Sequence, residues 1–390
     1  MTSEPIIEPD FRQKLLYRFG QQAEFTADYS PLYTHLFRTI ADWLKTADDP
    51  VVTWLLEAGM GRNSFDIPLL LAAGLHRDVL LHVPEVAGLA AYYPSVGGER
   101  PAGDPHFPTS LRQAILTRGI ALAGFIQTAT VQTNETGRGL CWLLPLLYTN
   151  WSAVHLVDLG ASAGLNLAAD QRAYRLIEVT NSQTHLDIGL GHPIQFLVHC
   201  RPTLPSLLSP PSFPHILSRT GCDIHPFGLQ TAEDENTLAA YIWPDQTLRH
   251  QRLREGIAAF HTINQTNVPI TLQAATLPDD LPDFLHSHVP SEPAPVVCYN
   301  TYITQYLRQR GALLRQHLAD WAANQLRPIL WLQWEPERTG NDGPEYGWLR
   351  WTADLWHERT HRQFYLAWVQ PHGTHVHFEP GLRQWAVNFQ

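Results

Sequence analysis

The stretch HLVDLGASAGLNLAAD (His155–Asp170) decides the fold of this chain. The apolar run AVHLVDLG is short, ends in a glycine-rich turn and precedes LNLAADQRAYRL, so the pattern predicts a strand, a turn and a helix. Gly160 and Gly164 allow the chain to turn sharply and let backbone N–H groups come close to a ligand. The expected helix points its positive N-terminal end toward the same place. In open α/β sheets that place, outside the carboxyl ends of the strands, is where ligands bind.

The chain before this turn differs in pattern from the chain after it. Before residue 153, apolar residues recur at helical spacing, as in Pro31–Ala47, Ile67–His82 and Ser110–Tyr148, and no strand is expected. After it, strand patterns alternate with helical ones. The expected strands are in ILSRTGCDIHP (ending at Asp223), VPITLQA, PVVCYN, RPILWLQW and three antiparallel segments near the C-terminus. We therefore predict a helical N-terminal domain over 1–150 and an α/β domain over 151–390 with a doubly wound, mostly parallel sheet.

The composition narrows the partners of the protein. Its 390 residues carry a net charge of −10, which argues against nucleic acid or an anionic membrane surface as the main partner. Apolar stretches are too short to span a bilayer, and the N-terminus lacks the basic start and apolar core of a signal peptide. The four cysteines are widely spaced, which is typical of reduced core thiols. We expect a cytoplasmic protein with a small-molecule substrate, and the oligomeric state is left open.

The glycine-rich turn resembles the first motif of class I S-adenosylmethionine-dependent methyltransferases, acidic-x-Gly-x-Gly-x-Gly, with Ser162 in place of the middle glycine. TLQAATLPDDLPDFL resembles the third strand and acidic turn of those enzymes, and PVVCYNTYITQYL their fourth strand and the helix after it. Nearly the whole chain is similar to a bacterial family known as domain of unknown function 2332. That similarity runs through YYPSVGG, QTNETGR, LGASAGLNL, RTGCDIHP, WPDQTLRHQRL and PHG. The family brings no established activity with it, whereas the methyltransferase resemblance implies a Rossmann-like sheet and S-adenosylmethionine as cofactor.

The methyltransferase resemblance also implies cofactor-binding residues. They are Asp158, Gly160, Ser162, Gly164 and Asn166 in the turn, and Asp223 at the end of the second strand. Asp223 would bind the ribose hydroxyls, although it lies much farther from the turn than the usual spacing of about 20 residues. Glu178 is nearer in sequence, so both acids stay open for this role.

Three further segments carry candidate substrate and catalytic residues. Asn300 and Tyr302 follow the fourth strand, where the transferable methyl group would sit, and either position the acceptor or cap the strand. The Asn-Pro-Pro-Tyr signature of amino-group methyltransferases is absent, because no proline follows Asn300. N-methylation of amides or bases is therefore not supported. His372 stands beside a glycine, where it can reach the crevice as a general base.

The third segment is QTNETGR, a polar block within an apolar stretch that directly precedes the glycine-rich turn. We interpret it as pocket lining, with a solvated turn or a buried structural pair as the alternative. Its candidate substrate-binding residues are Gln132, Asn134, Glu135 and Arg138. The cluster PHGTHVH holds three histidines, but neither a cysteine nor an H-E-x-x-H helix accompanies them, so no metal site is predicted.

The same turn also matches the G-x-S-x-G nucleophile elbow and looks like the elbow of hormone-sensitive-lipase-like esterases. Ser162 would then attack an ester, with His372 or His375 as base and Asp342 or Asp354 as the orienting acid. Such an elbow follows several earlier strands of its sheet, whereas only helices are expected here. Our hypothesis is methyl transfer from S-adenosylmethionine to a small polar acceptor. The alternatives are a serine esterase and a non-catalytic ligand-binding protein, in which the turn packs without chemistry.

Overall fold

The computed structural model describes residues 9–46, 48–132, 135–191, 196–204, 213–337 and 343–389. The chain divides into two compact units, one of Met1–Asn134 with Leu229–Gln251 and one of Glu135–Gly228 with Arg252–Gln390. The segment 229–251 therefore belongs with the N-terminal residues, although the chain reaches it only after several strands of the second unit.

The first unit is helical, and its described residues contain no strand, as the sequence pattern predicted. Ser30 and Asp49 cap helices that begin with a proline, and their side chains accept hydrogen bonds from the backbone N–H groups of Tyr33 and Val51. Its α-helices are α1 (Pro9–Phe25), α2 (Pro31–Leu44), α3 (Pro50–Ala58), α4 (Ile67–Leu80), α5 (Ala87–Ala90), α6 (Phe107–Thr117), α7 (Gly119–Thr128) and α9 (Ala232–Ala239). Two 3-10 turns, η1 (Pro84–Val86) and η2 (Pro94–Val96), flank α5.

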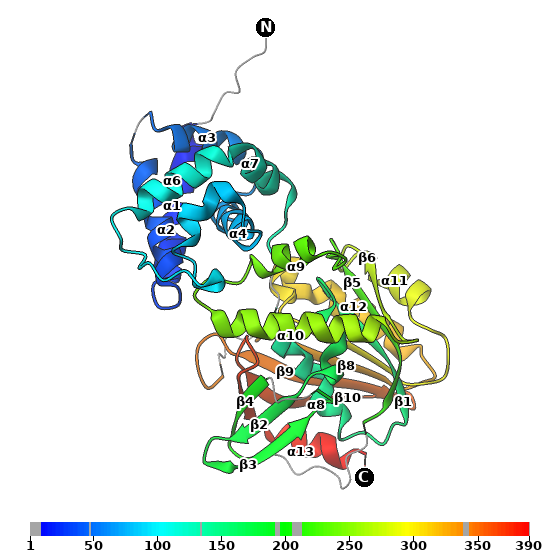
Figure 1. The fold of residues 1–390 in the computed structure, drawn as a ribbon. Helices are drawn as coiled ribbons and strands as arrows, with labels where there is room; N and C mark the ends of the chain where they lie inside the picture. Colours follow the sequence, from blue (N-terminus) through cyan, green and yellow to red (C-terminus); the bar gives the residue numbers. More distant parts are fainter. Residues whose placement is uncertain are drawn as a thin grey trace. The chain divides into compact units, whose positions relative to one another are not determined.

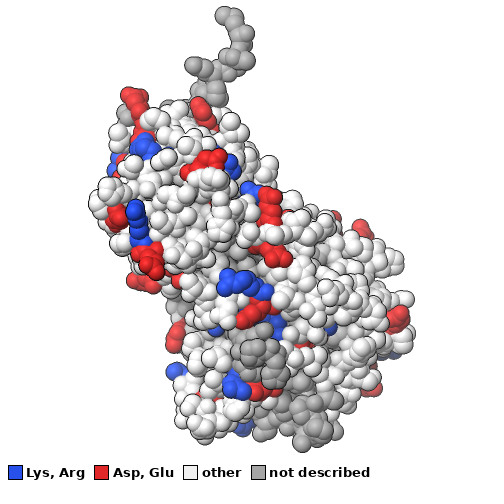
Figure 2. All heavy atoms as spheres, viewed as in Figure 1, with Lys and Arg blue, Asp and Glu red and all other residues white. Residues whose placement is uncertain are grey.

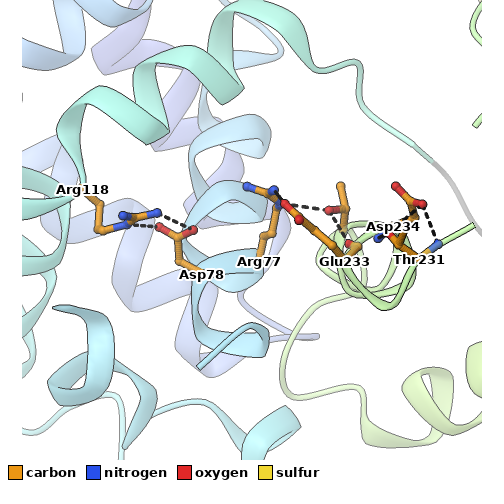
Figure 3. A network of polar contacts seen from close by, with 7 residues as sticks. Arg77, Asp78, Arg118, Thr231, Glu233 and Asp234 are labelled. Carbon is orange, nitrogen blue, oxygen red and sulfur yellow. Dashed lines mark hydrogen bonds and ion pairs between the residues drawn. The ribbon is translucent and has the colours of Figure 1, made fainter. Parts of the chain in front are cut away.

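Polar contacts join the late segment of this unit to α4 (Figure 3). The Arg77 Nε atom donates to Thr237 Oγ1 over 2.9 Å, and Arg77 also pairs with Glu233 on α9. The next residue of α4, the buried Asp78, accepts a hydrogen bond from Arg118 Nε over 2.8 Å. The segment 229–251 is thus bound to α4 by Arg77, in the last turn of that helix.

The second unit is built on an 11-stranded sheet in the order β3-β2-β4-β11-β10-β9-β8-β7-β1-β5-β6. Its strands are drawn as arrows in Figure 1. Strands β6, β5, β1, β7 and β8 form a continuous parallel run, and β9 and β10 follow as antiparallel neighbours. The strands are β1 (Ala153–Leu159), β2 (Tyr174–Glu178), β3 (Asn181–Ile188), β4 (Phe196–Arg201), β5 (His215–Asp223), β6 (Ile270–Ala274), β7 (Val296–Thr301), β8 (Ile329–Pro336), β9 (Leu349–His357), β10 (Thr360–Val369) and β11 (His375–Phe378). Its helices are η3 (Thr136–Gly139), α8 (Leu140–Leu146), η4 (Leu165–Gln171), α11 (Leu281–His288), η5 (Thr304–Tyr306), η6 (Arg308–Gly311), α12 (Ala312–Ala323) and α13 (Pro380–Val387). Helix α10 (Thr247–Asn264) is divided between the two units.

The sequence predicted the parallel strands and the antiparallel strands near the C-terminus. The prediction of a helix after the glycine-rich turn is wrong. In its place stands the short 3-10 helix η4, interrupted at Ala168, and the chain then enters β2 at Tyr174. Tyr174 and Leu176 are fully buried while the residue between them is not, which is the period of two that a strand requires. No long helix dipole therefore follows the turn.

The central parallel strands β1, β7 and β8 are buried on both faces. On β7, Tyr299 packs into the cluster that contains Trp142 of α8, whereas Cys298 packs into the cluster of α11 and α12. On β1, Leu156 lies in the first of these clusters and Val157 in the second. Such two-sided burial explains why these strands appear in the sequence as continuous apolar runs.

Several strand ends meet at one edge of the sheet. β9 is antiparallel to β8 and β10 is antiparallel to β9, so β10 runs in the same direction as β8, β7, β1 and β5. The carboxyl ends of these five strands therefore share an edge. That edge holds the glycine-rich turn, Asp223, Tyr302 and the turn 370–374.

Candidate functional site

The glycine-rich turn after β1 is tightly bonded to the end of β5. Gly160 and Gly164 have φ of +90° and +73°, and Ser162 also adopts a positive φ, of +50°. The N–H groups of Gly160 and Ala161 both donate to the carbonyl oxygen of Cys222, at 2.8 and 2.9 Å. The Gly164 N–H donates to Ala161 O over 2.7 Å. These backbone N–H groups are paired within the protein, contrary to the expectation that they face a ligand.

Asp223 lies where the sequence predicted an acid, at the end of the strand next to β1. Its Oδ2 atom accepts from the Ser162 N–H over 2.9 Å, and its Oδ1 atom accepts from the His225 N–H over 3.0 Å. Glu178 ends β2, which is separated from β1 by β4, β11, β10, β9, β8 and β7. Glu178 is therefore excluded as the alternative acid at this turn, because it belongs to a distant part of the sheet.

The space beside Gly160 is filled by another side chain. A Cβ atom at Gly160 would lie 2.5 Å from Ile303 Cγ2, and one at Gly164 would lie 3.1 Å from Leu272 Cδ2. Both distances are below ordinary van der Waals contact. The glycines thus allow close packing of β6 and of the loop after β7 against the turn.

Asp158 lies beneath the turn rather than on its surface. The Tyr299 hydroxyl donates to Asp158 Oδ2 over 2.7 Å, and only 4% of Asp158 is exposed. Burial raises the pKa of Asp158 to about 7, and the negative charge of Asp223 contributes to the rise. This carboxyl group therefore faces the core on the α8 side of the sheet.

Asn300 is also buried, and both ends of its amide have protein partners. Its Nδ2 atom donates to Glu335 Oε1 over 2.6 Å, and its Oδ1 atom accepts from Trp331 Nε1 over 2.6 Å. Glu335 on β8 also accepts from the N–H groups of Ile303 and Thr304, each at 3.0 Å. Burial raises the pKa of Glu335, although these hydrogen bonds favour its charged form. This arrangement matches the strand-cap alternative for Asn300, and it fixes the loop that carries Tyr302.

Glu335 was not predicted from the sequence. The only signal it left is an acidic residue at the end of the buried run RPILWLQWE.

Tyr302 and Arg138, predicted separately, are in contact. Tyr302 has a φ of +63°, and its N–H donates to Trp334 O over 2.8 Å. The Arg138 guanidinium carbon lies 5.1 Å from the centroid of the Tyr302 ring, which is a cation–π distance. Arg138 Nε donates to Pro371 O over 3.0 Å, so the same side chain reaches the turn after β10.

Glu135 and His372 form a hydrogen-bonded pair across 237 residues of sequence. His372 Nδ1 lies 2.9 Å from Glu135 Oε2, and the exposed fractions of the two side chains are 44% and 3%. The other carboxylate oxygen accepts from the Gly137 N–H over 3.3 Å, which places Glu135 at the start of η3. Asn166 Nδ2 donates to Glu135 O over 3.3 Å and joins this segment to η4. We call Glu135, Arg138, Asn166, Tyr302 and His372 the carboxyl-edge site.

The remaining sequence predictions fall elsewhere. Gln132 Nε2 donates to Thr130 Oγ1 in the first unit, and Asn134 lies outside the described residues. Asp342, one acid suggested for the esterase, also lies outside them.

The other elements of the esterase hypothesis have different partners. Asp354 accepts from His361 Nε2 over 2.9 Å and from Gln333 Nε2 over 3.1 Å, and the His375 ring stacks on His199. The acid that bonds His372 is thus Glu135 and not Asp354. Among the described residues, neither His372 nor His375 therefore pairs with Asp354, as the triad named for Ser162 would require.

A surface cavity between β10 and α13 is lined by Arg362, Phe364, Arg383, Gln384, Val387 and Asn388, none of which the sequence singled out. No group of three or more potential metal ligands occurs among the described residues. Within the same residues, no helix has the length and apolar character needed to cross a membrane. On the face drawn in Figure 2, basic and acidic side chains are interspersed among uncharged ones.

The fold and the site together define a mixed α/β protein with a large, mostly parallel sheet and many helices. The chain belongs to the family described as "Uncharacterized protein conserved in bacteria (DUF2332)", whose model matches residues 17–378. No curated protein and no solved structure matches the chain.

Proposed function

We propose that the second unit binds S-adenosylmethionine at the turn after β1 and transfers its methyl group to a small polar acceptor. The observation that carries this proposal is the order of the parallel strands. In chain order these strands are β1, β5, β6, β7 and β8, and in the sheet they lie as β6-β5-β1-β7-β8. This 3-2-1-4-5 arrangement is typical of doubly wound nucleotide-binding sheets, in which the ligand binds where the strand order reverses. The glycine-rich turn lies at that point.

Two acceptors at the turn fit such a cofactor. Asn166 Oδ1 is buried and has no hydrogen-bond partner among the described residues, so it can accept from the amino group of the methionine end. Asp223 accepts two backbone hydrogen bonds, but an ionised carboxylate has about four acceptor positions. Its remaining positions suit ribose hydroxyls.

The cofactor would supply an activated methyl group, and the protein would supply position and shelter from water. Tyr302 directly follows β7, which is the neighbour of β1 where the strand order reverses, and Arg138 of η3 lies over the Tyr302 ring. We assign to them the orientation of the acceptor. Because a sulfonium methyl group is already reactive, this function needs no serine triad.

Two observations favour a second function, a ligand-binding protein without catalysis. The space beside Gly160 is filled by Ile303, and the N–H groups of the turn are paired within the chain. A turn built in this way can serve packing first and hold a ligand only through side chains such as Asp223 and Asn166.

The test is isothermal titration with S-adenosylhomocysteine on the parent protein, Asp223→Asn and a control. Asp104→Asn is the control, because Asp104 Oδ1 accepts from the N–H two residues on, just as Asp223 Oδ1 does. We expect saturable binding to the parent and to Asp104→Asn. Loss of one charged hydrogen bond should weaken binding to Asp223→Asn about tenfold.

Two other outcomes have defined meanings. If the parent binds no S-adenosylhomocysteine at millimolar concentration, the methyltransferase proposal is refuted. Binding without methylation of any member of a broad acceptor panel would favour the ligand-binding function instead.

A further inference from the structure

We propose that Glu135 and His372 act as a proton-accepting pair and that the methyl acceptor is a hydroxyl group of a small molecule. This inference rests on the proposed function and names the substrate class for the same site. It starts from a hydrogen bond between two segments that the sequence gives no reason to connect.

The geometry defines which nitrogen of His372 is available. An ionised carboxylate only accepts hydrogen bonds, so the hydrogen on the neutral imidazole is on Nδ1, which lies 2.9 Å from Glu135 Oε2. The lone pair is then on Nε2, which has no hydrogen-bond partner among the described residues. Because 44% of the His372 side chain is exposed while Glu135 is buried, the basic nitrogen is the accessible end of the pair.

The pair is held in place from several directions. Glu135 also caps η3 through the Gly137 N–H. A Cβ atom at Gly137 would lie 2.8 Å from His372 O, so only glycine allows η3 to approach the turn this closely. The Gly373 N–H closes that turn by donating to Gln370 O over 2.8 Å. A general base held in this way loses little freedom when the substrate binds.

The positive charge of Arg138 favours one chemical class of methyl acceptor over another. Its guanidinium lies over Tyr302, and its Nε atom donates to the carbonyl oxygen next to His372. A fixed positive charge disfavours an ammonium acceptor and stabilises the negative charge that develops on an oxygen losing its proton. A carboxylate acceptor carries no proton on its nucleophilic atom and would need no base. The pair and the arginine together fit a hydroxyl group.

The O–H bond of the acceptor breaks and its proton passes to His372 Nε2, while the oxygen forms a bond to the methyl carbon. The bond between that carbon and the cofactor sulfur breaks, and its electron pair stays on sulfur. The products are a methyl ether, S-adenosylhomocysteine and a protonated His372, which returns the proton to water.

The chain contains a matched control pair. His361 Nε2 lies 2.9 Å from Asp354 Oδ1, and the side chains are 46% and 6% exposed. His361 stands at the start of β10 and His372 just after its end, so about eight strand residues, roughly 25 Å, separate the two pairs. The control pair therefore lies toward the opposite edge of the sheet.

The experiment compares His372→Asn, Glu135→Gln and His361→Asn with the parent. Affinity for S-adenosylhomocysteine is measured by titration. Methylation is measured by release of S-adenosylhomocysteine, with a panel of phenols and aliphatic alcohols, benzoate and phenylethylamine as probes. We expect unchanged affinity in all variants and methylation of a hydroxyl probe by the parent. The rate should fall about 100-fold or more in His372→Asn, about tenfold in Glu135→Gln and not at all in His361→Asn.

Each contrary result has a distinct meaning. No binding of S-adenosylhomocysteine to the parent refutes the proposed function. If the parent binds S-adenosylhomocysteine normally, three results overturn the hydroxyl inference. These are methylation of only benzoate or phenylethylamine by the parent, methylation of no probe at all, and methylation of a hydroxyl probe by His372→Asn at the rate of the parent. Nitrogen-15 NMR of the imidazole tests the pair without turnover. The pair is supported if the imidazole hydrogen of His372 is on Nδ1 in the parent and its position changes in Glu135→Gln. The pair is overturned if the hydrogen is on Nε2 in both proteins.

Discussion

Gly160 combines two constraints that a side chain cannot meet. Its φ of +90° costs an L-residue about 1–2 kcal/mol, and a Cβ atom there would overlap Ile303. Overpacking of this kind typically adds about 1–3 kcal/mol. The pattern of the sequence showed that a turn needs these glycines, but the partner of each glycine depends on a loop that lies far along the chain.

We predict that Gly160→Ala destabilises the protein by a few kcal/mol. The control is Gly347→Ala, because Gly347 has a φ of +81° and no neighbouring atom within 4 Å of an added Cβ. It should lose only about 1 kcal/mol, the cost of the backbone conformation. Urea denaturation of both variants measures the difference. Equal losses would show that Ile303 moves aside freely.

Because the pKa of Asp158 is raised, we expect the stability of the protein to depend on pH in an unusual way. The pKa of this residue is about 7 in the folded protein and near 3.8 when exposed. The folded state therefore keeps this proton at a pH where the unfolded chain has lost it. The stabilising contribution is fully present below about pH 4, falls as the pH rises toward 7 and is then absent.

Asp158→Asn removes this titration and keeps an oxygen that can accept from Tyr299. We expect the variant to gain stability relative to the parent as the pH rises from 4 to 8, by an amount on the order of a few kcal/mol. Urea denaturation at pH 4, 6 and 8 measures this gain. A constant difference between variant and parent would contradict the prediction.

Among the elements, the loop after β7 depends on a single buried carboxylate. Glu335 accepts from Asn300, from the N–H groups of Ile303 and Thr304, and from the Thr304 hydroxyl. The loop carries Tyr302 of the carboxyl-edge site. Its conformation is thus set by a residue of the neighbouring strand β8.

We predict that Glu335→Gln loosens this loop, because one acceptor oxygen becomes an N–H₂ group that faces donors. The expected loss of stability is roughly 2–5 kcal/mol. Hydrogen exchange at Ile303 and Thr304 should accelerate more than exchange in β1. Glu345→Gln is the control, since Glu345 is exposed and, among the described residues, its side chain accepts only from Trp348 Nε1 over 3.3 Å. Equal exchange at the loop in parent and Glu335→Gln would refute the role of Glu335.

The elements also show where periodicity succeeds and fails. Apolar runs such as PVVCYN and RPILWLQW predicted β7 and β8 because strands buried on both faces need continuous apolar residues. The prediction of one helix over LNLAADQRAYRL failed because the first half forms a buried 3-10 helix, while the second half enters β2 and alternates between buried and less buried residues. A short stretch that combines two periods has no single pattern to detect.

At the scale of the whole molecule, the segment 229–251 belongs with the first 134 residues. His76 on α4 binds it through a contact of 3.1 Å between Nδ1 and Ala240 O, and its Nε2 atom contacts Ser95 Oγ at 2.8 Å. Burial lowers the pKa of His76 to about 3, and His250 contributes to the decrease. The neutral imidazole is therefore part of the connection between distant segments.

The sign of the pH effect follows from this decrease. A histidine whose folded pKa lies below its unfolded value of about 6.5 stabilises the fold above pH 6.5 and loses that contribution as the pH falls toward 3. We predict that His76→Gln makes the stability less sensitive to pH between 7 and 4, whereas His106→Gln, at an exposed position, changes nothing. Thermal unfolding followed across this range, with hydrogen exchange over 232–246, measures the effect. An equally steep pH dependence in His76→Gln would contradict it.

The sequence by itself determined the helical character before residue 153, the strand and glycine-rich turn at 153–164, the parallel strands after it and the position of Asp223. These features are local, since periodicity, turn chemistry and burial leave their marks within a few consecutive residues. Only the tertiary structure joined Glu135 to His372 and Arg138 to Tyr302, set Glu335 beneath the loop after β7, and separated Glu178 from the turn. Those relations depend on which strands become neighbours in the sheet. That choice is made by the packing of the whole unit, and no stretch of sequence records it alone.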